Sequence, residues 1–353
     1  LRLNTNMYNI LEELSYFDSG FILALFMILI LSACLTAVYK SFAIKKEIIS
    51  NPNNRSLHKH FKPSGGGIVF SLICVFFVSI LGFYEAVDFE MLMVFGLGAF
   101  CASLFGFIDD IYDINPLTKL IIQIALSIWV ILWFDISELE ILSWLPIWAS
   151  IALCCFLLVW MMNLYNFMDG IDGMAASGTI FACFALIVTL ILTSGFSTLI
   201  IILLILLFSS LGFLIHNWPP ASIFMGDSGS IFLGYFFGSL IIISLISGEI
   251  SFWTWLIVFS YFFGDTNVTI IMRLILSKKW YKPHRSHGYQ NLARILDNHK
   301  KVTIGVQVYN IFYILPLTVF SVTIPMWAEF FSILAIAPVI ILSIYFGPRY
   351  SIE

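Results

Sequence analysis

Carboxylates gather in three short motifs of an otherwise apolar chain of 353 residues. The first motif, DDIYD, places Asp109, Asp110 and Asp113 directly after a long apolar run. Asp109 and Asp113 are four residues apart and would share a helix face, whereas Asp110 would point about 100° away. Like charges this close repel unless a cation lies between them, and Mg²⁺ prefers hard oxygens and usually recruits substrate phosphates as well. A solvated helix end is the structural alternative, but the helix dipole disfavours acids at a C-terminus.

The second motif, NLYNFMDGIDG, closes another apolar run. Asn163, Asn166 and Asp169 recur every third residue and would form one polar stripe on a helix, after which Gly170 and Gly173 let the backbone turn. A single Asn could serve helix packing. So many polar groups at the end of an apolar helix are costly unless they face a site, so the stripe favours a functional role.

The third motif, IFMGDSGSIFLGY, opens a further apolar run with Asp227, followed by Ser228 and Ser230. Alone, this pattern is typical of a helix N-cap. It gains weight because it would be the third Asp-rich and Gly-rich junction on one face of a membrane. A separate acid, Asp265, lies inside an apolar run, where an ionisable group is functional by default unless it pairs with Arg273 two turns later.

Two basic segments could bind phosphates. KKWYKPHRSHGYQN and NPNNRSLHKHFKPSGGG carry the candidate ligands His284, Arg285 and His287, and Arg55, Lys59 and Lys62 respectively. The glycines that end the second segment allow a backbone to approach a ligand closely. For the first segment the alternative is a topology determinant or a contact with anionic lipids, and for the second it is a flexible loop that happens to be basic.

Composition shows which elements must position these residues. Hydrophobic residues make up 60% of the chain, charged residues 11%, and the mean hydropathy is +0.99, which predicts an all-α polytopic membrane protein. About 20 apolar residues cross a bilayer as a helix. The sequence predicts eleven spans in a single membrane domain, 1–353, at 19–41, 67–84, 90–108, 117–134, 145–167, 175–193, 197–215, 229–247, 252–275, 303–322 and 325–346.

Charge sets the expected orientation. If the loop after the first span is cytoplasmic, every one of the 17 Lys and Arg residues except Arg2 lies on the cytoplasmic side. This predicts an N-terminus outside and a C-terminus inside. The active-site loops would then be cytoplasmic, at about 42–66, 109–116, 168–174, 216–228 and 276–302. The six cysteines all lie in apolar runs, without metal-ligand or redox spacing.

Carboxylates for Mg²⁺, an Asn/Asp stripe and basic loops against a hydrophobic bundle together describe phosphoryl transfer from a soluble phosphate donor to a lipid-borne acceptor. One alternative is an integral-membrane prenyltransferase, which should show two related DxxxD patterns and would leave the Asn stripe and GDSGS unexplained. Another is a cation-coupled transporter, which tends to place such groups near the membrane midplane and often contains repeats.

These motifs, in this order, resemble the polyprenyl-phosphate N-acetylhexosamine-1-phosphate transferases, a superfamily of glycosyltransferase family 4 type that includes MraY-type and WecA-type enzymes. The resemblance covers residues 51–291. It implies that Asp109 and Asp110 act on the lipid phosphate, and that Asp227 is the Mg²⁺ ligand, with help from Asp110. It also implies that the second motif holds the nucleotide and its sugar through Asn163, Asn166, Asp169 and Asp172. Lys59 or Lys62 would match a basic residue before the glycine turn.

Two departures favour one branch of that superfamily. Asp113 stands where MraY-type enzymes have lysine, and HRSHGYQ replaces their run of histidines. RSLHKHFKPSGGG also replaces the usual early-loop sequence. HRSHGYQ and RSLHKHFKPSGGG both resemble the WbpL-like subgroup that initiates O-antigen-type chains, which argues against peptidoglycan-precursor synthesis. The resemblance thus implies a bacterial inner-membrane enzyme that uses Mg²⁺ (Mn²⁺ as a substitute), undecaprenyl phosphate and a UDP-linked N-acetylhexosamine or deoxy-N-acetylhexosamine, and no nucleic acid. The sequence leaves the sugar, a covalent intermediate and a homodimer open.

Overall fold

The protein is a bundle of apolar helices. The structure, a computed structural model, describes residues 19–50, 62–195, 197–276 and 285–348. The α-helices in this part of the chain are α2 (Ser19–Lys45), α3 (Gly67–Phe83), α4 (Phe89–Met91), α5 (Ala99–Tyr112), α6 (Pro116–Trp133), α7 (Ile147–Met168), α8 (Met174–Thr193), α9 (Thr198–Asn217), α10 (Asp227–Ile246), α11 (Phe252–Val258), α12 (Ser260–Leu276), α13 (Gly288–Ile295), α14 (His299–Tyr309), α15 (Leu315–Thr323) and α16 (Ala328–Phe346).

Short elements join some of these helices. Two π-helical turns, η1 (Leu92–Gly98) and η4 (Asn310–Ile314), run into α5 and α15, and the 3₁₀ turns are η2 (Ile136–Glu138), η3 (Glu140–Leu142) and η5 (Pro325–Trp327). Strands β1 (Ile49–Ser50) and β2 (Lys62–Pro63) pair antiparallel, with Ile49 opposite Pro63.

Nine helices of the described chain are long and apolar enough to cross a membrane, which confirms an all-α polytopic membrane fold. The segment predicted as one span at 252–275 is bent by 78° between α11 and α12, and would be a tenth span if the pair crosses together. Helix α3 coincides with the remaining predicted span but has only 17 residues. The number eleven and the orientation stay predictions.

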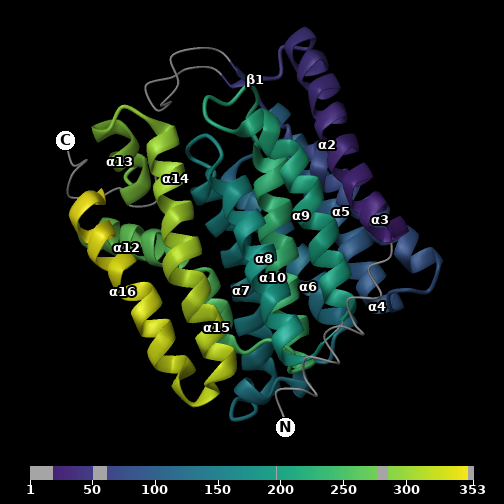
Figure 1. The fold of residues 1–353 in the computed structure, drawn as a ribbon, viewed down its shortest axis with the longest axis vertical. Coiled ribbons are helices and arrows are strands. Elements are labelled where there is room, and N and C mark those ends of the chain that lie inside the picture. The colour runs from purple at the N-terminus through teal and green to yellow at the C-terminus, as the bar shows by residue number, and fades with distance from the viewer. Residues whose placement is uncertain (1–18, 51–61, 196, 277–284, 349–353) are drawn as a thin grey trace.

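Helix α10 forms the centre of the bundle (Figure 1). Almost all its side chains are buried, and it packs mainly against α7, α5 and α3. Small residues allow this close packing: a Cβ built on Gly106 of α5 would lie 2.2 Å from the Asp227 carbonyl oxygen, and one on Gly67 would lie 2.3 Å from Gly229 Cα. Because lipid is as apolar as the core, such close backbone contact is a main source of helix association in membranes.

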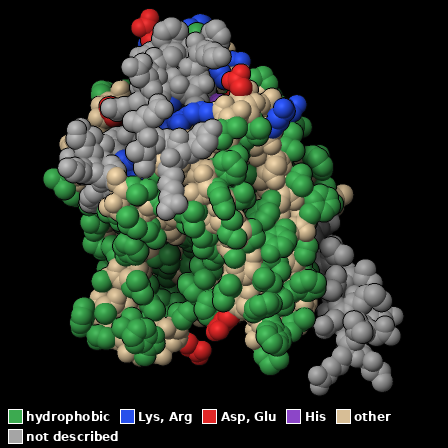
Figure 2. All heavy atoms as spheres, turned by 90° about the vertical axis from the view of Figure 1, so that its left-hand side faces the viewer, with side chains coloured by type: hydrophobic (Ala, Val, Ile, Leu, Met, Phe, Trp, Pro, Cys, Tyr) green, Lys and Arg blue, Asp and Glu red, His purple; other side chains and the backbone are tan. Residues whose placement is uncertain are grey.

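Polar and apolar side chains separate over the surface. Hydrophobic side chains cover the flank seen in Figure 2, and Lys and Arg gather at one end of the bundle. At this end α2, α5 and α7 finish and α6 and α10 begin, and we call it the site end. Large apolar residues such as Leu23, Leu132 and Phe312 are exposed on the flanks, as expected for helices that face hydrocarbon.

Candidate active site

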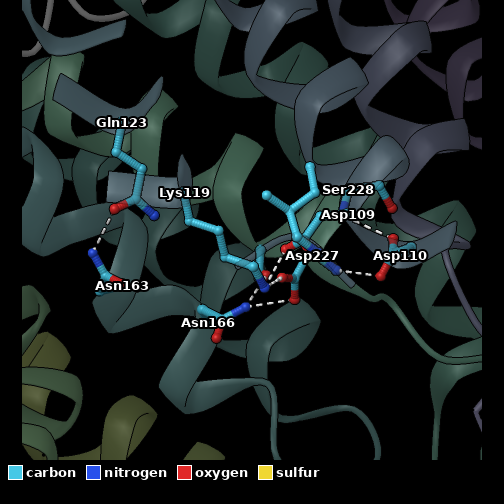
Figure 3. Close-up of polar contacts among 10 residues, drawn as sticks. Asp109, Asp110, Lys119, Gln123, Asn163, Asn166, Asp227 and Ser228 are labelled. Carbon is cyan, nitrogen blue, oxygen red and sulfur yellow. Dashed lines mark hydrogen bonds and ion pairs between the residues drawn. The ribbon is translucent and has the colours of Figure 1, made fainter. Parts of the chain in front are cut away.

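Two of the predicted aspartates meet at one ammonium group. Asp109 comes from the last turn of α5, Asp227 from the first turn of α10, and Lys119 from the first turn of α6 (Figure 3). Lys119 Nζ forms an ion pair with Asp109 Oδ2 and lies 3.3 Å from Asp227 Oδ2. The backbone N–H of Ile114 donates to Asp109 Oδ1 over 2.8 Å. We call Asp109, Lys119 and Asp227 the carboxylate centre.

The Asn stripe of α7 reaches the carboxylate centre at one position. Asn166 Nδ2 donates to Asp227 Oδ1 over 2.6 Å and to Ser230 Oγ over 3.2 Å. Asn163, one turn earlier, instead donates to Gln123 Oε1 of α6 over 2.9 Å (Figure 3). The stripe therefore fixes α7 against two neighbours, and only Asn166 touches a carboxylate of the centre.

Asp110 faces the start of α10. Its two carboxylate oxygens accept the backbone N–H groups of Asp227 (2.8 Å) and Ser228 (3.0 Å). The first N–H groups of a helix lack intrahelical partners and carry a partial positive charge, so a carboxylate there is stabilising. The dipole of α5 disfavours Asp110, but that of α10 favours it, and the contact fixes Asp227 in register with Asp109.

The expected position of Asp113 is wrong. Helix α5 ends at Tyr112, and Asp113 has φ 47°, in the left-handed region. Asp109 and Asp113 therefore do not share a helix face, and the exposed Asp113 lies in the turn that leads to α6. Asn115 then caps α6 by accepting the Thr118 N–H, and Pro116 begins the helix.

A second polar cluster surrounds Asp172. Its Oδ2 accepts the Ala221 N–H over 2.9 Å and lies 3.6 Å from Lys62 Nζ, and its Oδ1 lies 3.4 Å from His299 Nδ1. Burial alone would raise the pKa of Asp172, but the His299 and Ala221 hydrogen bonds and the Lys62 charge outweigh it and lower that pKa to about 2. Asp172 is thus held ionised, and it connects the turn after α7 to α14 and to the segment that precedes α10.

Asp169 was predicted to bind the nucleotide sugar, and its pKa is shifted in the opposite direction to that of Asp172. It follows the last residue of α7, just outside the helix. Burial, and then the negative charges of Asp227 and Asp110, raise the pKa of Asp169 well above its usual range. The acids at this end of the molecule therefore differ in charge state: Asp172 is held ionised and Asp169 is biased towards the protonated form.

Asp265 holds the end of the segment KKWYKPHRSHGYQN rather than pairing with Arg273. It accepts from His287 Nδ1 (3.0 Å), the Gly288 N–H (2.8 Å) and Ser343 Oγ (3.0 Å). Asp265 and His287 are each only 2% exposed, so the His287 ring is buried against α12. A hydrogen bond from Tyr289 to the Phe167 carbonyl fastens the same segment to α7, next to Asn166.

The other basic candidates are placed only in part. Lys62 also lies 5.1 Å above the Phe224 ring, and Arg285 is half-buried, with its carbonyl accepting from Arg294. Arg55, Lys59 and His284 lie outside the described residues. Sequence reasoning missed Lys119, which it counted only towards orientation. The NP turn after DDIYD was the available signal, because it brings the first turn of the next helix beside the last turn of α5.

The donor set agrees with magnesium chemistry. Among the described residues no group of three or more His, Cys, Asp or Glu side chains is arranged to hold a metal ion. Mg²⁺, however, often takes only one or two protein carboxylates and completes its shell with water and substrate phosphates. Asp109 and Asp227 supply such a pair, whereas both oxygens of Asp110, the second predicted ligand, accept backbone N–H groups.

An apolar groove lies beside this site. It has a volume of about 730 Å³ and is lined by α2, α3 and Phe107 of α5. Tyr39, which lines the groove, donates to the Ser64 carbonyl, and its ring is 6.3 Å from that of Phe107. A Cβ built on Gly65, which has φ +77°, would lie 2.7 Å from the Tyr39 hydroxyl and 3.4 Å from Asp110 Oδ2. The groove therefore extends from the flank of the bundle to Tyr39 and Phe107, and Gly65 adjoins both Tyr39 and Asp110.

Comparison with known proteins locates the family signal over the same elements. Residues 92–245 match the model of glycosyl transferase family 4, a range that contains Asp109, Lys119, Asn166 and Asp227.

Three relatives extend the match. The chain is 29% identical to a probable undecaprenyl-phosphate N-acetylglucosaminyl 1-phosphate transferase of Bacillus subtilis over 89% of this chain and 87% of the relative. It is 27% identical to an undecaprenyl-phosphate alpha-N-acetylglucosaminyl 1-phosphate transferase of Thermotoga maritima, over 82% and 88%. A phospho-N-acetylmuramoyl-pentapeptide-transferase of Petrotoga mobilis is 29% identical over 52% and 61%. These matches confirm the superfamily resemblance of the three motifs.

Proposed function

The chain contains a glycosyl transferase family 4 domain, and from this premise we propose that it transfers N-acetylhexosamine 1-phosphate from a UDP-sugar to undecaprenyl phosphate. The products would be undecaprenyl-diphosphate-sugar and UMP. The observation that carries this proposal is the carboxylate centre, placed at the end of a membrane bundle and beside an apolar groove. The family match favours this reaction over the prenyltransferase and the transporter.

The residues of the centre and their neighbours would have different roles in phosphoryl transfer. An oxygen of the lipid phosphate attacks the sugar-bearing phosphorus of the donor, and the bond from that phosphorus to the UMP oxygen breaks. Asp109 and Asp227 would hold Mg²⁺, which when bound supplies positive charge to the donor diphosphate. Asp110 and Asn166 keep Asp227 in place by their hydrogen bonds. The lipid phosphate is already anionic, so direct attack needs no covalent enzyme intermediate.

The donor would lie between α7 and the two basic segments. Asp169 and Asp172 follow α7, and Lys62 reaches Asp172 from the β1–β2 pair. Asp265 holds the end of the other basic segment at α12, and Tyr289 fastens it to the last turn of α7. Cationic groups of these segments, with Arg285 in the described part, would steady the diphosphate as charge moves onto UMP.

The acceptor would approach from the bilayer. Its phosphate must reach the carboxylate centre while its long isoprenyl chain stays in an apolar environment. The groove between α2 and α3 meets both needs, because it is open along the flank and its inner end, at Tyr39 and Phe107, adjoins Asp110. We therefore place the first isoprene units of the acceptor in this groove.

The remaining details follow the sequence expectations. We propose that the site end faces the cytoplasm of a bacterium, because Lys and Arg gather there. The segments HRSHGYQ and RSLHKHFKPSGGG, which resemble the WbpL-like subgroup, favour initiation of O-antigen or a related envelope polysaccharide.

Transfer of labelled sugar to extractable lipid tests this proposal. The purified protein is given undecaprenyl phosphate and UDP-N-acetylglucosamine, UDP-N-acetylgalactosamine or a deoxy-N-acetylhexosamine donor, with Mg²⁺, with Mn²⁺ or with a chelator. We expect at least one donor to label the lipid and the chelator to abolish labelling. Labelling that persists in the chelator would remove the magnesium step. Failure of every UDP-sugar together with consumption of a prenyl diphosphate would favour the prenyltransferase.

A further inference from the structure

A cation already lies between the two carboxylates of the centre. Lys119 Nζ contacts Asp109 Oδ2 and is 3.3 Å from Asp227 Oδ2, while Asn166 donates to the other oxygen of Asp227 (Figure 3). The ammonium group neutralises part of the repulsion between Asp109 and Asp227, which come from different helices. Lys119 is therefore the counter-ion of the pair as well as its neighbour.

The carboxylates are held more firmly than the ammonium group. The side chain of Asp109 is 1% exposed and accepts the Ile114 N–H. The side chain of Asp227 is 26% exposed, but it accepts from Asn166 and belongs to the first residue of α10, so it is short and fixed at both ends. The Lys119 side chain is 28% exposed and ends a flexible four-carbon stem. Of the three side chains of the centre, that of Lys119 can change its position without disturbing a helix.

Two cations cannot occupy this position together. A divalent ion bound by both carboxylates would stand about 2.1 Å from their oxygens, in the space now taken by the ammonium group, and like charges at that separation repel strongly. Given the metal dependence that the proposed function assigns, Lys119 must leave the pair when the divalent ion enters. The exposed side of the centre, where the substrate diphosphate would bind, is the direction open to it.

We propose that Lys119 is an exchangeable counter-ion, which holds Asp109 and Asp227 together when no divalent ion is bound and moves onto the donor diphosphate when one binds. The first role makes Lys119 a competitor of the metal, and the second makes it a ligand of the substrate. Removing the ammonium group should therefore tighten metal binding and weaken donor binding in the same variant. A lysine that only stabilises the fold would not produce these opposite shifts.

The test measures Mn²⁺ binding to the full-length protein by electron paramagnetic resonance, without substrate. Lys119→Met should lower the Mn²⁺ dissociation constant about tenfold. Lys119→Arg keeps a competing positive charge and should not tighten binding. Lys300→Met is the matched control, because Lys300 is exposed on the first turn of α14 and its loss removes the same charge from the site end. Equal or weaker Mn²⁺ binding in Lys119→Met, with normal binding in Lys300→Met, would overturn the proposal.

Two further readings complete the test. Lys119→Met should raise KM for the UDP-sugar about tenfold while lowering the half-saturating Mg²⁺ concentration. In the wild-type protein, Mn²⁺ should increase the acetylation of Lys119 by an amine-reactive reagent, read by mass spectrometry. An unchanged Lys119 reactivity would contradict the exchange even if the Met variant fails to fold. Neither Mn²⁺ binding nor acetylation needs sugar transfer, so these results stand apart from the proposed reaction.

Discussion

At the scale of single residues, four of the aspartates at the site end have three different settings. Asp109 and Asp227 share the Lys119 ammonium group, Asp110 accepts two backbone N–H groups, and Asp172 is ionised by its own partners. The proposed phosphoryl transfer requires carboxylates that can exchange an ammonium partner for a metal ion. Asp109 and Asp227, which share Lys119, have such a partner. Substitution of Asp227 should therefore lower activity, whereas substitution of Asp172 should lower stability.

Asp227→Asn should lower kcat by two to three orders of magnitude or about 3–4 kcal/mol, because it removes a charge that faces the reacting phosphates. Its melting temperature should stay close to that of the wild type, since Asn166 and Asp110 still hold the start of α10. The measurement is sugar transfer combined with thermal unfolding in detergent. Glu138→Gln, an exposed acid at the opposite end, is the matched control. Retention of wild-type activity in Asp227→Asn would contradict its role.

The ionised carboxylate of Asp172 predicts a pH dependence. Its pKa is lowered from 3.8 to about 2, so its contribution to stability is fully present above pH 4 and is lost as the pH falls towards 2. Asp172→Asn should therefore destabilise the protein by about 2 kcal/mol at pH 7, and the gap to the wild type should narrow below pH 4. Thermal unfolding of both proteins between pH 7 and pH 3 checks this. A constant gap would show that charge at Asp172 does not matter.

At the scale of elements, the site depends on how closely α5 and α10 approach. Gly106 leaves no room for a Cβ beside the Asp227 carbonyl, and this contact lets Asp110 reach the first N–H groups of α10. The same contact places Asp109 and Asp227 within reach of one lysine. The glycine is thus part of the site, although it has no side chain.

Gly106→Ala should force α5 and α10 apart and lower both stability and activity, by about 2 kcal/mol or more in unfolding free energy. Gly305→Ala is the matched control, because a Cβ at Gly305 in α14 meets nothing within 4 Å and alanine favours helix. Thermal unfolding should show a lower melting temperature for the first variant and an equal or higher one for the second. Equal behaviour of the two variants would refute the close-contact argument.

At the scale of the whole molecule, a membrane bundle brings a water-soluble donor and a lipid acceptor to one end. The carboxylate centre lies where α5, α6, α7 and α10 meet, and the apolar groove of α2 and α3 opens on the flank beside it. The acceptor chain can then remain in hydrocarbon while its phosphate reaches Asp109 and Asp110. Filling the groove should affect acceptors according to chain length.

Leu72→Trp places a bulky ring in the groove and should raise KM for undecaprenyl phosphate several-fold. The KM for a short acceptor such as farnesyl phosphate should rise less, since less of its chain enters the groove. Ile128→Trp on α6, which is exposed but does not line the groove, is the matched control. Equal KM changes for the two acceptors would place the chain elsewhere.

Much of this arrangement could be predicted from the sequence, because bilayer thickness restricts helix length and a lone acid in such a helix is costly. The motifs that contain Asp109, Asn166 and Asp227 were expected at one face of the membrane, and in the structure these three residues lie close together. Their roles stay predictions. The partner of the acids, Lys119, was missed because its contact depends on the register between helices, which apolar runs do not encode. Asp113 was misplaced because a single left-handed residue ends α5, and the bend before Asp265 left no Pro or Gly signal at Phe259.

The most direct test of the central claim follows the sugar-bearing phosphorus of the donor. UDP-N-acetylhexosamine labelled at the sugar-bearing phosphorus is incubated with undecaprenyl phosphate, Mg²⁺ and either the wild-type protein or Asp227→Asn. The account predicts that the labelled phosphorus enters the lipid with release of UMP, and that Asp227→Asn largely abolishes this transfer. Label that remains in soluble UDP while the sugar enters the lipid would contradict phospho-sugar transfer and the role given to the carboxylate centre.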